Sequence, residues 1–490
     1  MQVRQLKLSC FRNYRELTLV PGEGLNILHG ANAQGKSNIL EALSLLATTR
    51  SLRASRESEL ILRGAEMAHV IAEVDREREG EAELQVSVFQ SDKKAVRING
   101  LKRGRVVELL GQFNAVFFGS IDLAIVTGEP SQRRHYLNVE ISQISPRYVY
   151  DLGHYKRVLE QRNRLLRDLR ENPRTLAHSG LDAWNEQLIV HGAPLFEKRR
   201  FYIERLAPLA DQIHRELTDG KEGLEIRYLP NIPLPPEFPV APPVVRESTP
   251  EERYLAEAEE NIDSAPGAAT SAALPEAPES PLSGTEAIAA AFREQLGVLA
   301  SDELRRGTTL IGPQRDDIAF LIDGAEARIY GSQGQQRTVA LALKLAEFRL
   351  IEDYVGEPPV MLLDDVMSDL DDTRRGHLLA WIRRRCQTFL TCTNLRSFPK
   401  DILAEAATFK VVAGTVTPDG SRKLRTTTPI QPNESPPAEA RNNGHYAAGE
   451  AAENAAPPEP AERPARRAAA GRRAGGPPPW PSPQEQGEGA

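Results

Sequence analysis

The stretch LNILHGANAQGKSNILEALSLL, Leu25 to Leu46, decides the fold class of this chain. Gly30, Gly35, Lys36 and Ser37 fit the phosphate-binding pattern G-x-x-x-x-G-K-[ST]. An apolar run precedes the pattern and an amphipathic run follows it, which predicts a strand, a glycine loop and a helix in that order. The alternative is an ordinary glycine-rich turn before a helix, which would not require both flanking elements.

The chemistry of a phosphate loop explains why these residue types are needed. Small residues let successive backbone N–H groups point at an anion next to a helix N-terminus, which carries about half a positive charge. In such a loop, Lys36 reaches the β- and γ-phosphates, and Ser37 places a hydroxyl on Mg²⁺. We therefore expect this loop to bind a nucleoside triphosphate together with Mg²⁺.

A second stretch, VMLLDD at Val360 to Asp365, is an apolar strand that ends in two carboxylates. A metal-holding acid is expected at the C-terminal edge of a parallel sheet. We assign metal coordination to Asp364 and polarisation of the attacking water to Asp365. The carboxylates could instead only cap the next helix, but the segment Ser368 to Asp371 that follows argues against this alternative.

A third stretch, GSQGQQRTVALALKLAEF at Gly331 to Phe348, predicts a second helix start with free N–H groups and a serine hydroxyl. One phosphate loop and two anion-binding helix starts are most simply explained if the second serves a γ-phosphate held by another copy of the chain. The alternative is a plain helix cap formed by Ser332.

These three stretches define the expected site. The predicted catalytic residues are Lys36, Asp364 and Asp365, and the predicted metal ligands are Ser37 and Asp364. The predicted nucleotide contacts are Gly30, Ala31, Asn32, Ala33, Gln34, Gly35, Lys36, Ser37, Asn38, Ser332, Gln333, Gly334 and Gln335.

Composition limits the class of protein. The chain has 490 residues, of which 40% are hydrophobic and 26% charged, as in soluble globular proteins. Three cysteines without metal-ligand spacing indicate free thiols in a reducing compartment. The chain has no run of 18 apolar residues and its N-terminus has no signal-peptide pattern, so we expect a cytoplasmic protein without a membrane partner. The net charge of −7 argues against coating of nucleic acid by the whole surface.

The order of patterns along the chain predicts five segments. Strand-like alternation in Val3–Leu8, Glu16–Val20, Ala68–Val74, Glu83–Phe89 and Ala95–Asn99 indicates an α/β lobe with an antiparallel edge. The segments are an N-terminal half-lobe with the phosphate loop (1–147), a helical subdomain (148–230), a disordered Pro/Ala/Glu-rich insertion (231–286), a C-terminal half-lobe (287–428) and a disordered tail (429–490).

In the expected helical subdomain, helical spacing begins at Tyr148, with one helix in the run Tyr150 to Leu169 and a second over 183–206. After the insertion we expect a helix at 287–299 and strands over 308–330. Arginines lie between the apolar positions of this subdomain. They could form a solvated helix face or a stripe that faces nucleic acid, and the sequence leaves both readings open. The same holds for the arginine pairs of the tail, which could tether DNA or only solubilise the chain.

Taken together, these motifs resemble the ATP-binding cassette ATPases, with SQGQQ as the signature and SDLD as the loop toward an opposing subunit. Further runs narrow the resemblance to the RecF family, SMC-like cassette ATPases of bacterial DNA replication and repair without long coiled-coil arms. The runs are NAQGKSNILEAL, RSLRASRESELI, VRINGLKRGR, TGEPSQRRHYLN, YKRVLEQRN, GPQRDD and YGSQGQQRT. The implied fold is α/β, a cassette-type P-loop ATPase head with an inserted helical subdomain.

The resemblance implies a function and its partners. It implies an ATP-dependent homodimer that binds junctions of single- and double-stranded DNA, and cooperation with RecO and RecR to load RecA on gapped DNA. ATP and Mg²⁺ would be the ligands, and a weak DNA-stimulated ATPase would time release. We expect DNA contacts from arginines of residues 48–56 and of the helical subdomain, with strong salt dependence.

The chain departs from the family pattern at several positions. Gln314 replaces a usual histidine, Gly119 to Ile121 replace Ser-Pro-Glu, and His135 replaces a frequent arginine. Thr393 and Asn394 stand where cassette ATPases often carry a histidine, which would suit slow hydrolysis. Two rival hypotheses remain: an ATPase subunit of a transporter, and a nucleotide-switched DNA clamp that does not hydrolyse ATP.

Overall fold

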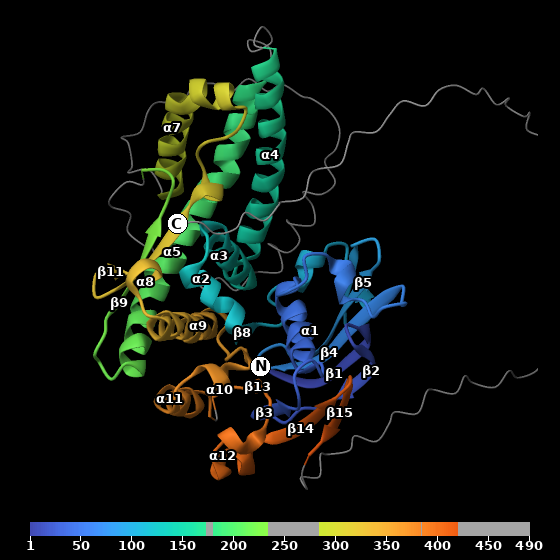
Figure 1. The fold of residues 1–490 in the computed structure, drawn as a ribbon. Coiled ribbons are helices and arrows are strands. Elements are labelled where there is room, and N and C mark those ends of the chain that lie inside the picture. Colours follow the sequence, from blue (N-terminus) through green and yellow to red (C-terminus); the bar gives the residue numbers. More distant parts are fainter. Residues whose placement is uncertain (173–179, 234–283, 384, 420–490) are drawn as a thin grey trace, which may run out of the picture. The chain divides into compact units, whose positions relative to one another are not determined.

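The structure is a computed structural model that describes residues 1–172, 180–233, 284–383 and 385–419 (Figure 1). Nearly all of the predicted disordered insertion, and the whole predicted tail, lie outside the described residues. Among the described helices, none combines the length and the apolar character needed to cross a lipid bilayer.

The phosphate loop belongs to a six-stranded sheet whose strands are mostly parallel. Its order is β15 (Thr415–Pro418), β14 (Ala407–Val412), β3 (Leu25–His29), β13 (Thr388–Cys392), β12 (Val360–Asp364) and β8 (Ala115–Gly119). Only the β14–β15 pair is antiparallel. The register places Asp364 beside Thr391 and Cys392 beside His29, so the carboxyl ends of β12, β13 and β3 meet at one edge, as the sequence predicts.

A second sheet of six strands is antiparallel, and it confirms the strands expected in the first hundred residues. Its order is β2 (Tyr14–Leu19), β1 (Gln2–Phe11), β4 (Met67–Arg76), β5 (Gly80–Phe89), β6 (Lys94–Ile98) and β7 (Leu101–Lys102). Alternate residues of β4, among them Val70 and Ala72, are fully buried, which is the pattern of a sheet with one covered face.

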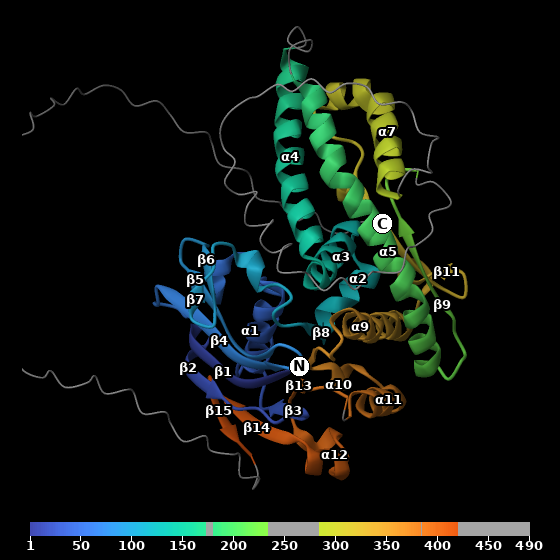
Figure 2. The same cartoon turned by 180° about the vertical axis from the view of Figure 1, so that it is seen from behind.

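Helix α1 (Lys36–Thr48) packs against strands of both sheets (Figures 1 and 2). Its apolar residues, including Ile39, Leu43 and Leu46, are fully buried in the core that the two sheets share. Alternation within β12 explains the layering, because Leu362 faces this core whereas Leu363 belongs to the core on the other side of the parallel sheet. The helix that follows the phosphate loop is therefore held rigidly between two layers.

Helices cover the other face of the parallel sheet. The long helix α9 (Gln333–Val355) is buried over most of its length and contacts β8, α2 (Leu123–Thr127) and α5 (Leu181–Leu217). The remaining helices of the C-terminal half are α8 (Ala327–Tyr330), α10 (Val366–Asp369), α11 (Asp372–Ile382) and α12 (Lys400–Glu405).

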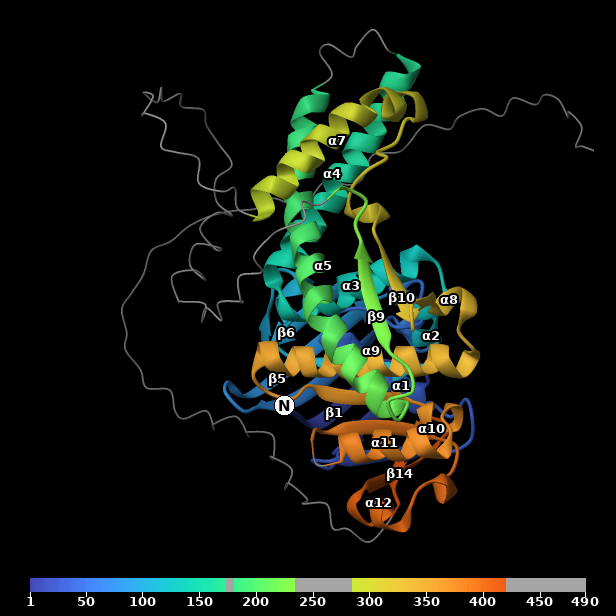
Figure 3. The ribbon, with the colours of Figure 1, turned by 90° about the vertical axis from the view of Figure 1, so that its left-hand side faces the viewer.

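The helical part is built from both sides of the insertion. Helix α5 packs on α4 (Pro146–Glu171) and on α7 (Gly284–Arg306), and Figure 3 shows these three helices side by side. A three-stranded sheet in the order β11 (Ala325–Glu326), β10 (Asp317–Ile322) and β9 (Leu224–Leu229) lies against α5. Helix α3 (Pro130–Ile144) leads into α4. The helical part therefore includes α7 and β10, whereas the sequence-based segments place both elements in the C-terminal half-lobe.

Two local predictions need correction. The expected helix over 183–206 is confirmed, but it extends over Leu181–Leu217 and contains Pro194 and Pro208. Burial of Ala210, Ile213 and Leu217 beyond the second proline offsets the penalty of about 3 kcal/mol for proline within a helix. The expected strands within 308–330 are confirmed only for β10 and β11, because the preceding residues form a turn at Pro313–Arg315.

Candidate nucleotide site

The phosphate loop starts where β3 ends, and its two pattern glycines have backbones that other residues rarely adopt. Gly30 has φ of 150° and Gly35 has φ of 112°. A Cβ atom on Gly30 would lie 2.3 Å from the backbone oxygen of Val411, and one on Gly35 would lie 2.5 Å from the Asn13 amide nitrogen. Both glycines are therefore required by conformation and by space.

Neighbouring loops hold the phosphate loop in place. The Gln34 backbone oxygen accepts hydrogen bonds from the Asn13 side chain at 2.9 Å and from the Gly414 backbone N–H at 3.1 Å. The Gln34 side chain accepts from the Ala413 N–H at 2.7 Å. The loop is thus fastened to turns of both sheets, and its conformation is set before any ligand arrives.

Lys36 is the buried cation of this loop. Its ammonium donates to the backbone oxygens of Gly30 at 2.7 Å and Ala31 at 2.8 Å, and no described carboxylate forms an ion pair with it. Burial lowers the pKa of Lys36, against the opposing charges of Asp365 and Asp364. A buried ammonium held only by carbonyl dipoles is a site for an anion, so this residue fits a phosphate ligand.

The metal-ligand candidates are in direct contact. The Ser37 hydroxyl donates to a carboxylate oxygen of Asp364 at 2.6 Å, and the Thr391 hydroxyl donates to the same oxygen at 2.8 Å. A hydroxyl and a carboxylate are oxygen ligands of the kind that Mg²⁺ prefers. The donor set therefore fits a magnesium ion.

Asp365 lies next to this pair on a strained backbone. Its φ of 55° is left-handed, and its N–H donates to the Thr391 hydroxyl at 2.9 Å. Thr391 thereby positions both acids of the strand end. A non-glycine residue in this region stores about 1–3 kcal/mol of strain, which is common at functional sites.

These groups surround a cavity of about 260 Å³. It is lined by Asn32, Ala33, Gly35, Lys36, Ser37, Asn38, Arg53, Asp365 and Thr391. Helix α1 begins here without a side-chain cap and without an acidic residue in its first turn, so its N-terminal N–H groups face the cavity unscreened. The loop, the helix start and the acids thus converge on one space.

Arg53, from the segment after α1, also lines this cavity. Its guanidinium donates to the Asn38 side chain at 3.1 Å and to Glu41 at 3.3 Å. Glu41 is fully buried and also accepts two hydrogen bonds from Arg12 and one from Ser51. This network, centred on Glu41, fixes Arg53 at the mouth of the cavity.

The second predicted helix start lies elsewhere. Ser332 caps α9: its hydroxyl accepts from the Gln335 N–H at 3.2 Å, and the Gln335 side chain accepts from the Ser332 N–H at 2.8 Å. Ser332 and Gln333 are exposed, and among the described residues neither they nor Gly334 line the cavity around Lys36. The cap is present, yet the N–H groups of Gln333 and Gly334 have no acceptor within the described part of the chain.

The structure therefore brings together most of the predicted residues of the first site and leaves the Ser332 group apart. The sequence analysis did not identify Arg53 as a cavity residue, nor Thr391 as the residue that links Asp364 and Asp365. The sequence offered one signal for Arg53, which is the arginine-rich run after α1. For Thr391 the signal was its place on the strand next to that of Asp364.

The arginines of the helical part divide into two classes. Arg162 and Arg199 are buried and pair with Glu303 at 2.6 Å and Asp316 at 2.8 Å. These two arginines stabilise the fold. They therefore lie neither on a solvated helix face nor on a stripe that could contact nucleic acid. Arg157 and Arg164 are exposed, as both readings of the sequence expected.

The fold and this site define an ATPase of the ATP-binding cassette type. Residues 2–413 match the protein family described as the RecF/RecN/SMC N terminal domain. The chain belongs to this family and, within it, groups with the RecF proteins.

The relatives cover almost the whole of the described chain. It is 37% identical to the DNA replication and repair protein RecF of Cyanothece sp., over 85% of this chain and 98% of the relative. It is 36% identical to that of Geobacillus kaustophilus, over 85% and 99%. A solved structure titled as the recombination mediator protein RecF with ATP in the RecFOR pathway is 32% identical, with a TM-score of 0.69 over 85% of this chain and 97% of that one. The resemblance seen in the sequence is confirmed.

Proposed function

We propose that this protein is an ATP-dependent DNA-binding protein of replication and recombinational repair. The observation that carries the proposal is the unpaired buried ammonium of Lys36 beside the Ser37–Asp364 contact, a combination suited to a triphosphate with its metal. The relatives that share this chain's whole described length carry names from DNA replication and repair, and one was solved with ATP.

In this proposal, the loop from Gly30 to Asn38 binds the phosphates and Lys36 neutralises them. Ser37 and Asp364 would hold Mg²⁺, which would supply charge neutralisation for the phosphates. Asp365 orients the attacking water, and Thr391 positions Asp365 through the hydrogen bond to its N–H. Asn394 accepts from the Arg396 N–H and no histidine stands beside it, which supports slow hydrolysis.

We further propose that the Ser332 loop of a second copy completes each nucleotide site. The exposed N–H groups of Gln333 and Gly334 support this, because a helix start without acceptors attracts an anion. A polyanion that neither copy satisfies alone stabilises the dimer by mass action. Hydrolysis then removes the bridge, and ATP acts as a timer for DNA engagement.

The DNA ligand and the partner proteins are proposed from the relatives. The solved relative is named for the RecFOR pathway, so we propose RecO and RecR as partners, loading of RecA on gapped DNA as the outcome, and single- to double-strand junctions as the target. Three free cysteines fit the reducing compartment in which such a protein would act, which we take to be the cytoplasm.

The test is DNA binding by the full chain with a labelled gapped duplex, with and without Mg·ATP. We expect binding that requires ATP and that falls steeply with salt. Binding that is indifferent to ATP would contradict the proposal. Single-turnover hydrolysis on the same complex separates a slow ATPase from a clamp that does not hydrolyse ATP.

A further inference from the structure

Two adjoining cavities of about 240 and 630 Å³ lie at helices α3 and α4. Ser131, Arg134, Leu159 and Gln314 line both of them, so the cavities form one continuous space, which we call the α3–α4 cleft. Among the described residues, the cleft shares no lining residue with the nucleotide cavity. It is large enough for a ligand of nucleotide size or longer.

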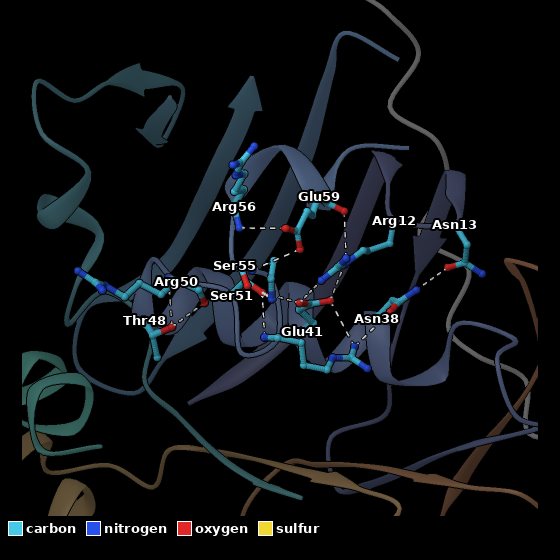
Figure 4. A network of polar contacts seen from close by, with 12 residues as sticks. Arg12, Asn13, Asn38, Glu41, Thr48, Arg50, Ser51, Ser55, Arg56 and Glu59 are labelled. Atoms are coloured by element: carbon cyan, nitrogen blue, oxygen red, sulfur yellow. Dashed lines mark hydrogen bonds and ion pairs between the residues drawn. The ribbon is translucent and has the colours of Figure 1, made fainter. Parts of the chain in front are cut away.

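Among the described residues, two cations of the cleft, Arg134 and Lys156, have no carboxylate partner. Arg134 is half-buried, and its described hydrogen bond goes to the backbone oxygen of Asp316 at 2.9 Å. Lys156 and His135 are exposed at the smaller cavity. Within the described ranges, neither Lys156 nor the side chain of Arg50 has a hydrogen-bond or ion-pair partner, and Figure 4 shows Arg50 pointing away from Glu41.

Other buried arginines of the same region do have carboxylate partners. Arg133, the sequence neighbour of Arg134, pairs with Asp317 at 2.6 Å, and Arg162 and Arg199 have carboxylate partners of their own. A buried cation normally has such a partner because removal from water is unfavourable. One carboxylate, Glu129, lines the larger cavity, but it pairs with Arg328 at 3.2 Å. Among the described residues, Arg134 and Lys156 in the cleft therefore have no ion-pair partner.

The electrostatics of the cleft agree with this reading. Part of the Lys156 side chain is exposed, but the covering of the rest by neighbouring atoms removes water and lowers its pKa, and the charges of Arg50 and Arg199 lower the pKa further. Burial and then Arg50 lower the pKa of His135. Burial and then Arg199 lower the pKa of Arg134, against the opposing effect of Asp317 and Asp316. An anion in the cleft would reverse these shifts, because it would favour the charged forms.

We propose that the α3–α4 cleft binds the phosphodiester backbone of a DNA strand, at a site separate from the nucleotide cavity. The cations that line the cleft come from two elements, Arg134 from α3 and Lys156 from α4. Arg50, in the segment after α1, lines neither cavity but adds positive charge near Lys156. Cations on separate elements suit successive phosphates of a strand better than a single small anion. The inference rests on the proposed DNA-binding function and specifies where a strand is held.

The test compares two double variants with equal loss of charge. Arg134→Gln with Lys156→Gln removes two cations that line the cleft. Arg157→Gln with Arg164→Gln removes two exposed arginines of α4 that line neither cavity. Affinity for a gapped duplex with Mg·ATP is measured by anisotropy over a series of salt concentrations. We expect the cleft variant to bind roughly tenfold or more weakly at low salt, with a salt slope smaller by about two, and the control to resemble wild type.

The outcomes separate the inference from the proposed function. Wild-type protein that does not bind the duplex would overturn the proposed function. Wild-type binding with equal affinity and slope in both variants would overturn the cleft alone. Inorganic phosphate at matched ionic strength is the third arm: a release of DNA by millimolar phosphate in wild type but not in the cleft variant would show a site for a small free anion. We expect no such difference, and both variants should bind a fluorescent ATP analogue like wild type.

Discussion

Two helices of this protein begin at glycine-containing turns, and their N-termini differ in what surrounds them. Helix α1 starts at Gly35 with no side-chain cap, a buried lysine and two acids close by. Helix α9 starts at Ser332 with a complete capping box and an exposed position. The first has a cation and metal ligands of its own, whereas the second offers only two N–H groups.

The difference teaches how much of a nucleotide site one chain can supply. The α1 start is fastened by Gln34, Asn13 and the buried Glu41 network, so it is rigid before a ligand binds. At the α9 start, Gln335 contacts Glu222 at 3.0 Å from a partly exposed position. One helix start is a nearly complete site, and the other is a half-site that requires a ligand held by another molecule. The following predictions would break or sharpen this contrast.

Lys36→Met should have the largest effect. A charged hydrogen bond contributes about 1.5–3 kcal/mol, so the Kd for ATP should rise by roughly 10- to 150-fold. The fold should keep its stability, because the buried ammonium has no carboxylate partner to leave behind. Titration with a fluorescent ATP analogue and a thermal melt measure both effects. Lys7→Met, on an exposed ion pair with Glu73, is the matched control, and equal ATP affinities of the two variants would contradict the assignment.

Glu41→Gln should loosen the α1 start and change its response to pH. Burial alone would raise the pKa of Glu41, but hydrogen bonds from Arg12 and Ser51 outweigh it and hold the pKa below its usual value of 4.5. The ionised form therefore stabilises the fold above pH 4.5, and this contribution is lost as the pH falls through the lower folded-state pKa.

We expect the Glu41→Gln substitution to lower the free energy of unfolding by about 1.5–3 kcal/mol near neutral pH. The loss should shrink as the pH falls through the lowered folded-state pKa of Glu41, because the wild-type carboxylate is then protonated as well. Urea unfolding at a series of pH values measures it. A deficit of the same size at every pH would show that charge is not the reason for the loss.

A pair of glycine substitutions contrasts the two helix starts directly. Gly35→Ala should lower stability by about 1–3 kcal/mol, because φ is 112° and the new Cβ would lie 2.5 Å from Asn13. Gly334→Ala should be neutral or stabilising by up to about 1 kcal/mol, since its Cβ would make only ordinary contacts, the nearest at 3.6 Å. Equal losses in urea unfolding would remove the contrast.

Ser332→Ala should destabilise the fold less than Glu41→Gln or Gly35→Ala. Loss of the cap should lower the free energy of unfolding by about 1 kcal/mol, whereas Ser332→Asp keeps a good cap and should be close to wild type. If Ser332 is only a cap, Ser332→Asp should also retain ATP-dependent dimerisation. We expect the opposite, because a carboxylate at that helix start repels a phosphate held by the second copy.

The same contrast shows what the sequence could and could not predict. The phosphate loop, the strand of Asp364 and most strands of the first hundred residues follow from local patterns, and the structure confirms their positions. Strand β8 and helix α3 were not predicted, since a five-residue apolar run has no periodicity and the apolar residues of α3 do not gather on one face.

Residues whose role depends on a distant partner were also missed. Arg53 reaches the cavity because Glu41 and Asn38 hold it, and Thr391 serves Asp364 because β13 pairs with β12. The ion pairs of Arg162 and Arg199 join helices with segments more than a hundred residues away, which helical spacing cannot reveal. Local sequence determines the elements, whereas tertiary pairing decides which of their side chains form the site.

Mixing two defective variants tests the central claim most directly. The Lys36→Met variant binds ATP weakly at its own phosphate loop but keeps the Ser332 helix start. The Ser332→Asp variant keeps the phosphate loop but has a helix start that repels phosphate. The ATP concentration is set so that Lys36→Met is not saturated. Sedimentation velocity with Mg·ATP should show each variant alone as a monomer and the mixture as a heterodimer, because one composite site is then intact. A mixture that stays monomeric while the wild-type protein dimerises, or either variant dimerising alone, would contradict the completion of each site by a second copy.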